Sequence, residues 1–309
     1  MLEVIQDLSK FKPSTKPLVT IGTFDGVHAG HMQVIQRLVE NAQAQNVESM
    51  LITFDPHPRE ALGLGKIALL SLLGEKIKLL ESTDLDFLLV LPFTREFSEL
   101  SALEFIHEYL IKQLNISGII LGYDHKFGNK REGGIELLKQ ELLPLGVGVE
   151  EIPAQAVDSI IVSSTKIRHA LTLGNPKEAN RLLGYNYAFE GKVVHGLKNG
   201  RMLGYPTANL EPTSPSKLIP GKGVYAVQCF VNNLQCKGMM NIGIRPTLDG
   251  LQEVIEVHLL DFNSDIYGAT VRVELHERIR DEQKFSSLNE LKEQLARDEK
   301  HVRSTFLLS

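Results

Sequence analysis

Hydrophobic and polar positions follow two different patterns along the chain, and the change between them falls near Tyr185. Up to about Leu183, short apolar runs alternate with longer stretches in which apolar residues recur every three or four positions. The first pattern is typical of buried β-strands and the second of amphipathic helices. The runs that predict strands are PLVTIGT from Pro17, SMLITF from Ser49, DFLLVLP from Asp86 and SGIILGY from Ser117.

The stretches between these strands predict helices. The helix predicted over 101–114 begins with Ser101 and has Glu104 three residues later, which is a capping-box pattern. Strand–helix–strand alternation predicts an α/β domain with a parallel, doubly wound, Rossmann-like sheet, on which ligands bind beyond the carboxyl ends of the strands. The helix predicted over 31–43 has one apolar stripe, made of Val34, Ile35, Leu38, Val39 and Ala42.

After Tyr185, predicted strands follow one another with only Gly, Pro and Asn turns between them, and Asn232-Asn233 predicts a hairpin. This pattern predicts an all-β barrel or sandwich. A final amphipathic helix is expected to begin near Ser286 and to pack on the barrel through the face that carries Leu288, Leu291 and Leu295. The expected domains are 1–184 and 185–309.

Composition and charge narrow the class of protein. The 309 residues are 43% hydrophobic and 23% charged, as in an ordinary globular protein, and the net charge of −5 argues against nucleic acid as a partner. No apolar run approaches the ~18 residues of a membrane span, and the first residues lack a signal-peptide pattern. We therefore expect a soluble, cytoplasmic protein. Cys229 and Cys236 are expected to be small, half-buried side chains of a hairpin.

The segment GTFDGVHAGH, from Gly22 to His31, carries the sharpest chemical signal of the first domain. It follows the first predicted strand and leads into a helix, whose N-terminal amides favour anions. Glycines such as Gly30 let the backbone approach phosphates closely. His28 and His31 can stabilise charge that develops on an α-phosphate. Each histidine alone would equally fit a satisfied side chain beside a turn, but the spacing and position favour catalysis.

This segment resembles the loop of the HxGH nucleotidylyltransferases, and SSTKIR from Ser163 resembles their second marker. On the residues alone SSTKIR is a good helix cap. With TFDPHP from Thr53 and GYDHKFGNKREGG from Gly122, the domain is similar to the FMN adenylyltransferase half of the bacterial bifunctional flavin cofactor synthases. His125 departs from the family pattern, which often has an aromatic there.

The resemblance implies functions for individual residues. His28 and His31 would be catalytic. Nucleotide would be bound by Gly22, Phe24, Asp25, Gly30, Ser164, Thr165 and Arg168. Flavin would be bound by Asp55, His57, Pro58, Asp124 and Phe127, and Asp124 would also contact metal.

The segment GLKNGRMLGYPTANL, from Gly196 to Leu210, carries the signal of the second domain. Its glycines can cover phosphates, although alone they also fit a β-turn. Thr207 and Asn209 lie two residues apart, and so on one face of a strand, where their oxygens suit Mg²⁺ held against ATP. Glu256 lies on a later strand, and its carboxylate can act as a general base for a hydroxyl or simply face solvent.

NIGIRPT from Asn241, DIYG from Asp265 and RIRDEQKF from Arg278 complete a resemblance to the riboflavin kinases. It implies that Glu256 deprotonates the riboflavin 5′-hydroxyl. It also implies that Arg278 contacts flavin, and that Mg²⁺-ATP is bound by Gly200, Arg201, Thr207 and Asn209.

The working hypothesis is a bifunctional riboflavin kinase and FMN adenylyltransferase, with riboflavin, FMN, FAD and ATP as ligands and Mg²⁺ as metal. Two alternatives are a monofunctional chain with one inactive site and a flavin-sensing binding protein. The presence of His28, His31, Thr207, Asn209 and Glu256 disfavours both.

Overall fold

A computed structural model describes residues 1–309 except 64, 66, 123, 124, 155, 158, 159, 197–203, 248, 249, 308 and 309, and without the side chains of 156, 157, 160, 245–247 and 250–252. The chain divides into two compact units, Met1–Ser164 and Thr165–Ser309, each of which is described by itself.

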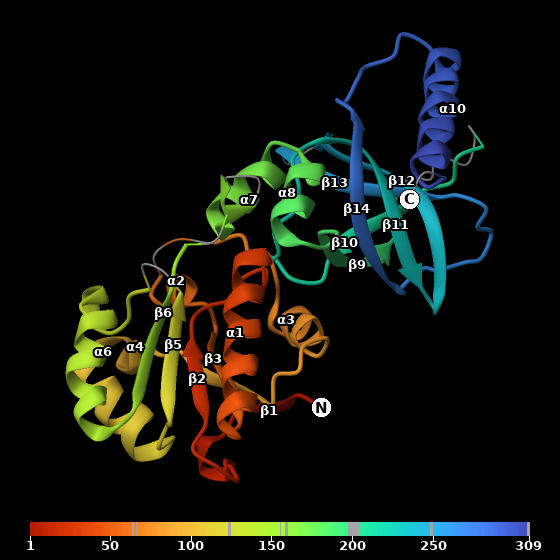
Figure 1. Cartoon of the computed structure of the whole chain (residues 1–309). Helices are drawn as coiled ribbons and strands as arrows, with labels where there is room; N and C mark the ends of the chain where they lie inside the picture. The colour runs from red at the N-terminus through yellow and green to blue at the C-terminus, as the bar shows by residue number, and fades with distance from the viewer. Residues whose placement is uncertain are drawn as a thin grey trace. The chain divides into compact units, whose positions relative to one another are not determined.

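The first unit is built on one parallel sheet with the strand order β1-β4-β3-β2-β5-β6 (Figure 1). The chain runs from β2 outwards to β4, and then returns to the other side of β2 with β5. The carboxyl ends of β2 and β5 therefore flank the switch point, where sheets of this class bind ligands. The strands are β1 (Glu3–Ile5), β2 (Leu18–Ile21), β3 (Ser49–Asp55), β4 (Phe87–Pro92), β5 (Gly118–Gly122) and β6 (Gly148–Ile152).

Helices cover both faces of this sheet, because alternate strand residues point to opposite sides. One face packs against α1 (Ala29–Gln45) and α3 (Leu73–Leu80). The other packs against α5 (Ala102–Glu104), the π-helix η2 (Phe105–Gln113) and α6 (Ile135–Leu142). Shorter elements are η1 (Leu8–Lys10), α2 (Pro58–Ala61), α4 (Arg95–Glu99), η3 (Asn129–Arg131), η4 (Leu143–Leu145), β7 (Ala156–Val157) and β8 (Ile160–Ile161).

The predicted doubly wound sheet is confirmed. All four predicted strands are present, the stripe of α1 is buried, and the capping box between Ser101 and Glu104 is formed. Strands β1 and β6 were not predicted, because they are short and carry charged residues in place of an apolar run.

The second unit contains a closed antiparallel barrel in the order β10-β13-β12-β11-β14-β9 (Figure 1). Closure selects the barrel over the sandwich that the sequence left open. The hairpin at Asn232-Asn233 is confirmed, and both residues have positive φ. Cys229 and Cys236 are free and directly opposite in this hairpin. The strands are β9 (Ala188–Val194), β10 (Ala208–Pro212), β11 (Gly223–Val231), β12 (Leu234–Thr247), β13 (Gly250–Leu259) and β14 (Thr270–Arg280).

The C-terminal helix α10 (Leu288–Thr305) packs on the barrel, as expected. Leu288 is 69% exposed, whereas Asp298 and Val302 are buried. Asp298 is paired with the guanidinium of Arg280, with Nη2 and Oδ2 2.8 Å apart. Leu291 and Leu295 are half-buried on the same helical face as Asp298 and Val302, so the contact follows that face and is deepest in the last turns.

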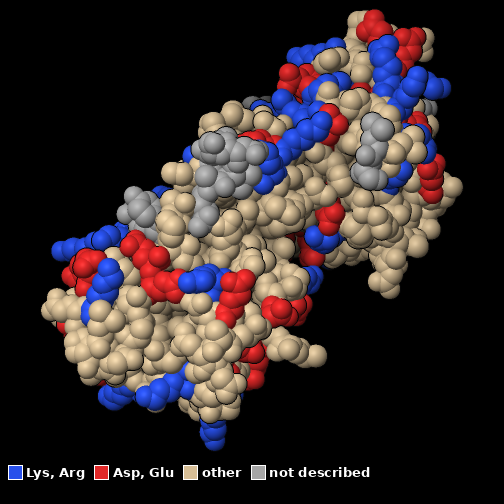
Figure 2. Space-filling view, viewed as in Figure 1, with Lys and Arg blue, Asp and Glu red and all other residues tan. Residues whose placement is uncertain are grey.

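No helix in the described ranges is long and apolar enough to cross a membrane. Figure 2 shows acidic and basic side chains interspersed on the face drawn, rather than gathered into a basic surface.

Helices α7 (Ser164–Thr172) and α8 (Pro176–Leu183) precede the barrel, and α8 is bonded to it. The side chain of Asn180 donates to the carbonyl of Leu275 at 2.8 Å and accepts from the amide of Tyr187 at 2.8 Å. Lys177 pairs with Glu277. These bonds make α8 part of the second unit.

We expect a fragment that starts at Thr165 to be more stable than one that starts at Tyr185, because the shorter fragment leaves the α8-facing groups of the barrel uncovered. Loss of the two Asn180 bonds alone should lower the free energy of unfolding by about 1–3 kcal/mol. Urea unfolding of both fragments measures the difference. Equal midpoints would show that α8 contributes nothing to the barrel.

Candidate active sites

The turn from β2 into α1 holds the HxGH segment in an irregular backbone. Phe24, Gly26 and Val27 all have positive φ, which is costly for the two non-glycine residues. A Cβ at Gly30 would lie 3.3 Å from the His28 ring, so glycine leaves room for that ring at the helix start. The strained turn therefore carries the histidines directly above the amides of α1.

The two imidazoles are stacked, with ring centroids 3.5 Å apart and planes 11° apart. His28 caps α1, because its Nδ1 accepts from the backbone N–H of His31 at 3.2 Å. An Nδ1 that accepts must be unprotonated, so the ring proton of His28 lies on Nε2. Burial, and then the neighbouring His28 and Lys76, hold the pKa of His31 well below its ordinary value. The pair therefore offers neutral hydrogen-bonding groups rather than two cations.

Asp25 is an anchor of this turn. Its carboxylate is only 2% exposed and accepts from the amides of Leu70 at 3.1 Å and Ser71 at 2.9 Å. The amide of Gly26 donates in turn to the hydroxyl of Ser71 at 2.8 Å. These bonds tie Asp25 to the segment that braces the loop, and the nucleotide contact expected for Asp25 stays a prediction.

Phe24 and Gly22 lie in the same turn, the first with an apolar ring and the second with no side chain. Phe24 is buried and packs against the ring of His31, with centroids 4.9 Å apart. A Cβ at Gly22 would lie 3.0 Å from the Phe24 ring. Gly22 and Phe24 thus shape the turn, and Gly30 opens its helix end.

The loop after β3 lies at the same edge of the sheet, because β2 and β3 are parallel. Asp55 is exposed, and His57 caps α2 by accepting from the amide of Arg59 at 3.2 Å. Pro58 is the first residue of that helix. The three predicted flavin residues of this loop therefore lie beside the switch point.

The loop after β5 folds back through Phe127, which exchanges two backbone hydrogen bonds with Gly133. The Phe127 ring packs against Phe105, with centroids 5.8 Å apart. Burial, and then Arg131, lower the pKa of His125 to about 4, and its Nε2 is buried without a partner in the described structure. Asp124, the expected metal and flavin ligand of this loop, lies outside the described residues.

Helix α7 begins at the HxGH turn. The hydroxyl of Ser164 donates to the backbone carbonyl of Asp25 at 3.0 Å. Thr165 and Arg168 follow on the same helix. The structure thus brings Ser164 to the loop that carries His28.

Lys76 is a buried residue beside the HxGH turn that the sequence did not single out. It projects from α3, is 6% exposed, and donates to the carbonyl of Thr23 at 2.7 Å and to the hydroxyl of Thr53 at 3.0 Å. Burial lowers the pKa of Lys76 to about 8, although Asp25 and Asp55 oppose the shift. A lysine in a helix of mixed charge gives no signal of burial, so only the docked helix reveals it.

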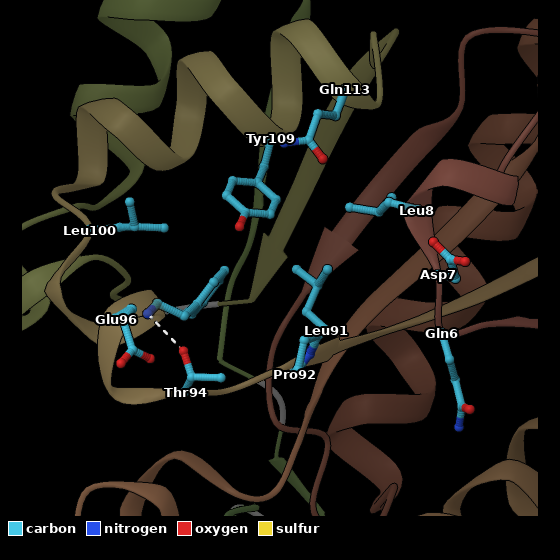
Figure 3. A pocket seen from close by; sticks show the side chains of 11 residues that line it. Gln6, Asp7, Leu8, Leu91, Pro92, Thr94, Glu96, Leu100, Tyr109 and Gln113 are labelled. Carbon is cyan, nitrogen blue, oxygen red and sulfur yellow. Dashed lines mark hydrogen bonds between the residues drawn. The ribbon is translucent and has the colours of Figure 1, made fainter.

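A pocket of about 430 Å³ lies elsewhere on the first unit, beyond the carboxyl ends of β1 and β4. Figure 3 shows the Tyr109 ring directed into it, with Leu8 and Leu91 nearby. None of the predicted site residues lines it. The predicted site residues therefore lie apart from this pocket.

In the barrel, strand register assembles the second site. Glu256 on β13 is directly opposite Asn209 on β10 and also directly opposite Asn241 on β12. Directly paired residues present side chains on the same face of a sheet. Asn209, Glu256 and Asn241 therefore form a half-buried polar row across three strands, of which sequence reasoning had singled out the first two as site residues.

Glycines bring other segments close to this row. A Cβ at Gly196 would overlap the Asn209 amide, so the segment that precedes the glycine-rich stretch passes directly over it. A Cβ at Gly243 would overlap the Glu282 carboxylate and lie 3.2 Å from the Asn241 amide. Glu282 is thus a second acid beside the row. Gly200 and Arg201 lie outside the described residues.

Thr207 and Asn209 are residues of this site that could share a metal ion with a bound nucleotide. Within the described ranges, no group of three or more His, Cys, Asp or Glu side chains gathers to hold a metal. Thr207 and Asn209 offer two oxygens at the start of β10, and Mg²⁺ commonly takes few protein oxygens together with phosphates and water.

Arg278 is not brought to the polar row. Its strand β14 is the third from β13 in either direction around the barrel. Its guanidinium donates to the carbonyl of Lys222 at 2.6 Å and pairs with Asp281. The side chain holds the loop before β11, and the flavin contact expected for Arg278 stays a prediction.

An HxGH turn at the switch point of a parallel sheet, followed by a barrel with an acid–amide row, defines a two-domain enzyme of nucleotide-dependent group transfer. Residues 10–166 match the FAD synthetase family and residues 183–306 match the riboflavin kinase family. The bifunctional riboflavin kinase/FMN adenylyltransferase of Escherichia coli K12 is 39% identical over all of this chain and 98% of its own. That of Listeria monocytogenes is 38% identical over 94% of this chain and 92% of its own.

A crystal structure from Streptococcus pneumoniae, described as a macrolide-efflux protein, is 33% identical, has a TM-score of 0.88 and covers 98% of both chains. The chain belongs to the bifunctional riboflavin kinase/FMN adenylyltransferase family. It phosphorylates riboflavin to FMN with ATP, and adenylylates FMN to FAD with release of pyrophosphate. Enzymes of this kind generally work with a divalent metal ion.

Proposed function

We propose that the two reactions are carried out by two separate sets of residues, His28 and His31 in the first unit and Glu256 with Thr207 and Asn209 in the barrel. The observation that best supports this proposal is the strand register that sets Glu256 directly opposite Asn209. We further propose that Mg²⁺ is the metal and that the enzyme acts in the cytoplasm, where ATP is made.

In adenylylation, the FMN phosphate attacks the α-phosphate of ATP and pyrophosphate leaves. The amides at the start of α1 favour the anionic phosphates. The Nε2–H of His28 donates to an oxygen on which charge develops, because its Nδ1 is occupied by the cap. Exposed Asp55 and the His57–Pro58 turn lie where they can orient the flavin. Ser164, Thr165 and Arg168 would contact the leaving pyrophosphate.

His28→Asn tests this role without disturbing the helix cap, because the Asn oxygen can replace Nδ1 as acceptor while the distal N–H is lost. FAD formation from added FMN should fall about 10²–10³-fold, as for loss of one charge-stabilising donor. Riboflavin phosphorylation by the same chain should be unchanged. Exposed His107→Asn is the control, and full FAD formation in His28→Asn would reject the donor role.

In phosphorylation, the riboflavin 5′-hydroxyl attacks the γ-phosphate of ATP. Glu256 accepts the hydroxyl proton. Pairing of its strand with the strands of Asn209 and Asn241 sets the face of the barrel that carries the Glu256 side chain. Thr207 and Asn209 would hold Mg²⁺, which when bound neutralises charge on the ATP phosphates. Gly196 lets the adjoining segment approach Asn209.

Glu256→Gln keeps the size of the side chain but removes the proton acceptor. Kinase turnover should fall by about 10²–10⁴-fold, towards the smaller end because phosphoryl transfer asks little of a base. The KM values for riboflavin and ATP should change little. Glu282→Gln is the matched comparison, and if that variant were the more damaged, the neighbouring acid would replace Glu256 as base.

Asn209→Ala should raise the Mg²⁺ concentration needed for half-maximal phosphorylation, because one of two oxygen ligands is removed. High Mg²⁺ should restore part of the rate, whereas FAD formation from added FMN stays normal. Titration of both activities with Mg²⁺ measures this. An unchanged Mg²⁺ requirement would remove Asn209 from the metal site.

A further inference from the structure

Lys76 joins the two loops on which the adenylylation site is built. Its ammonium bonds the carbonyl of Thr23, in the turn after β2, and the hydroxyl of Thr53, near the end of β3. Thr53 also donates to the carbonyl of Thr23 at 3.2 Å. One side chain from α3 thus ties the turn that carries His28 to the strand that ends in Asp55.

Packing alone does not require a charge at this position. The side chain is 6% exposed, and moving an ammonium from water into a protein interior is unfavourable. A methionine of similar length would fill the space without that cost. Replacing Lys76 with methionine would remove two hydrogen bonds. The carbonyl of Thr23 would still accept one, because the Thr53 hydroxyl donates to it.

The site also needs a positive charge that its histidines do not supply. His28 keeps Nδ1 unprotonated to cap α1, and burial keeps His31 neutral at physiological pH. Both substrates bring anionic phosphates to this turn. Lys76 is the cation that lies directly beneath it and interacts with His31, Asp25 and Asp55.

We propose that Lys76 is a positioning residue for adenylyl transfer, which fixes the loops after β2 and β3 to each other and holds a positive charge beneath the phosphate-binding turn. The proposal rests on the proposed function of those loops. It assigns Lys76 no contact with substrate, because the side chain is enclosed.

The test compares Lys76→Met and Lys76→Arg with Lys78→Met, which removes an exposed lysine of the same helix. In Lys76→Met, kcat/KM for FMN adenylylation should fall about 10-fold or more. Riboflavin phosphorylation should stay within about twofold of wild type, and the unfolding temperature should be unchanged or higher because a buried charge is removed. Lys78→Met should change none of these.

The pH profile separates charge from packing. Wild-type adenylylation should decline as pH rises through about 8, where Lys76 loses its proton. The other charged or titratable groups that face it are the carboxylates of Asp25 and Asp55 and the imidazole of His31, and burial lowers the pKa of His31 well below its ordinary value. In Lys76→Arg the decline should move to higher pH, because guanidinium keeps its charge.

Three results would overturn the proposal. The first is adenylylation within about twofold of wild type in Lys76→Met. The second is an alkaline decline that is the same in wild type and Lys76→Arg. The third is a parallel loss of both activities and of the unfolding temperature, which would make Lys76 a structural residue. A normal rate in His28→Asn would reject the donor role of His28. The results for the Lys76 variants could still be interpreted, because each is compared with riboflavin phosphorylation by the same chain.

Discussion

The carboxylate of Asp25 is the constraint on which the geometry of the adenylylation site depends. It accepts from two successive amides, at Leu70 and Ser71, and the next residue of the loop bonds the Ser71 hydroxyl. These bonds hold a turn with two non-glycine residues at positive φ, which would otherwise relax. Because the turn is held, His28 can cap α1 and present its distal nitrogen.

The two active sites are fixed by different physical means. The first stands on loops at the ends of parallel strands, where no ladder hydrogen bonds continue, so buried polar groups such as Asp25 and Lys76 must tie the loops together. The second stands on a strand face, where pairing in the ladder itself sets Glu256 between Asn209 and Asn241. Residues on separate loops can move independently of one another, whereas residues on paired strands cannot.

The sequence predicted much of this fold because local patterns determine it. Apolar runs located β2 to β5, and turn residues located the barrel hairpin. Features that depend on contacts between distant segments could not be predicted as well. Burial of Asp25 and Lys76 arises when α3 and the segment before it dock on the strand ends, and no spacing in the sequence records that docking. Strand register, which the sequence does not show, places Asn241 beside Glu256 and puts Arg278 on a strand across the barrel from it.

The register of β13 has a consequence for chains that fold incorrectly. Glu256 alternates with Ile255 and Val257, which are 4% and 1% exposed. A slip of one residue would turn the carboxylate into the core and both apolar neighbours outwards. Such a chain would lose both the position of Glu256 beside Asn209 and its apolar core in one event. Barrels with the shifted register would therefore not consume ATP. Phosphorylation activity would in turn indicate that the barrel has been assembled in the correct register.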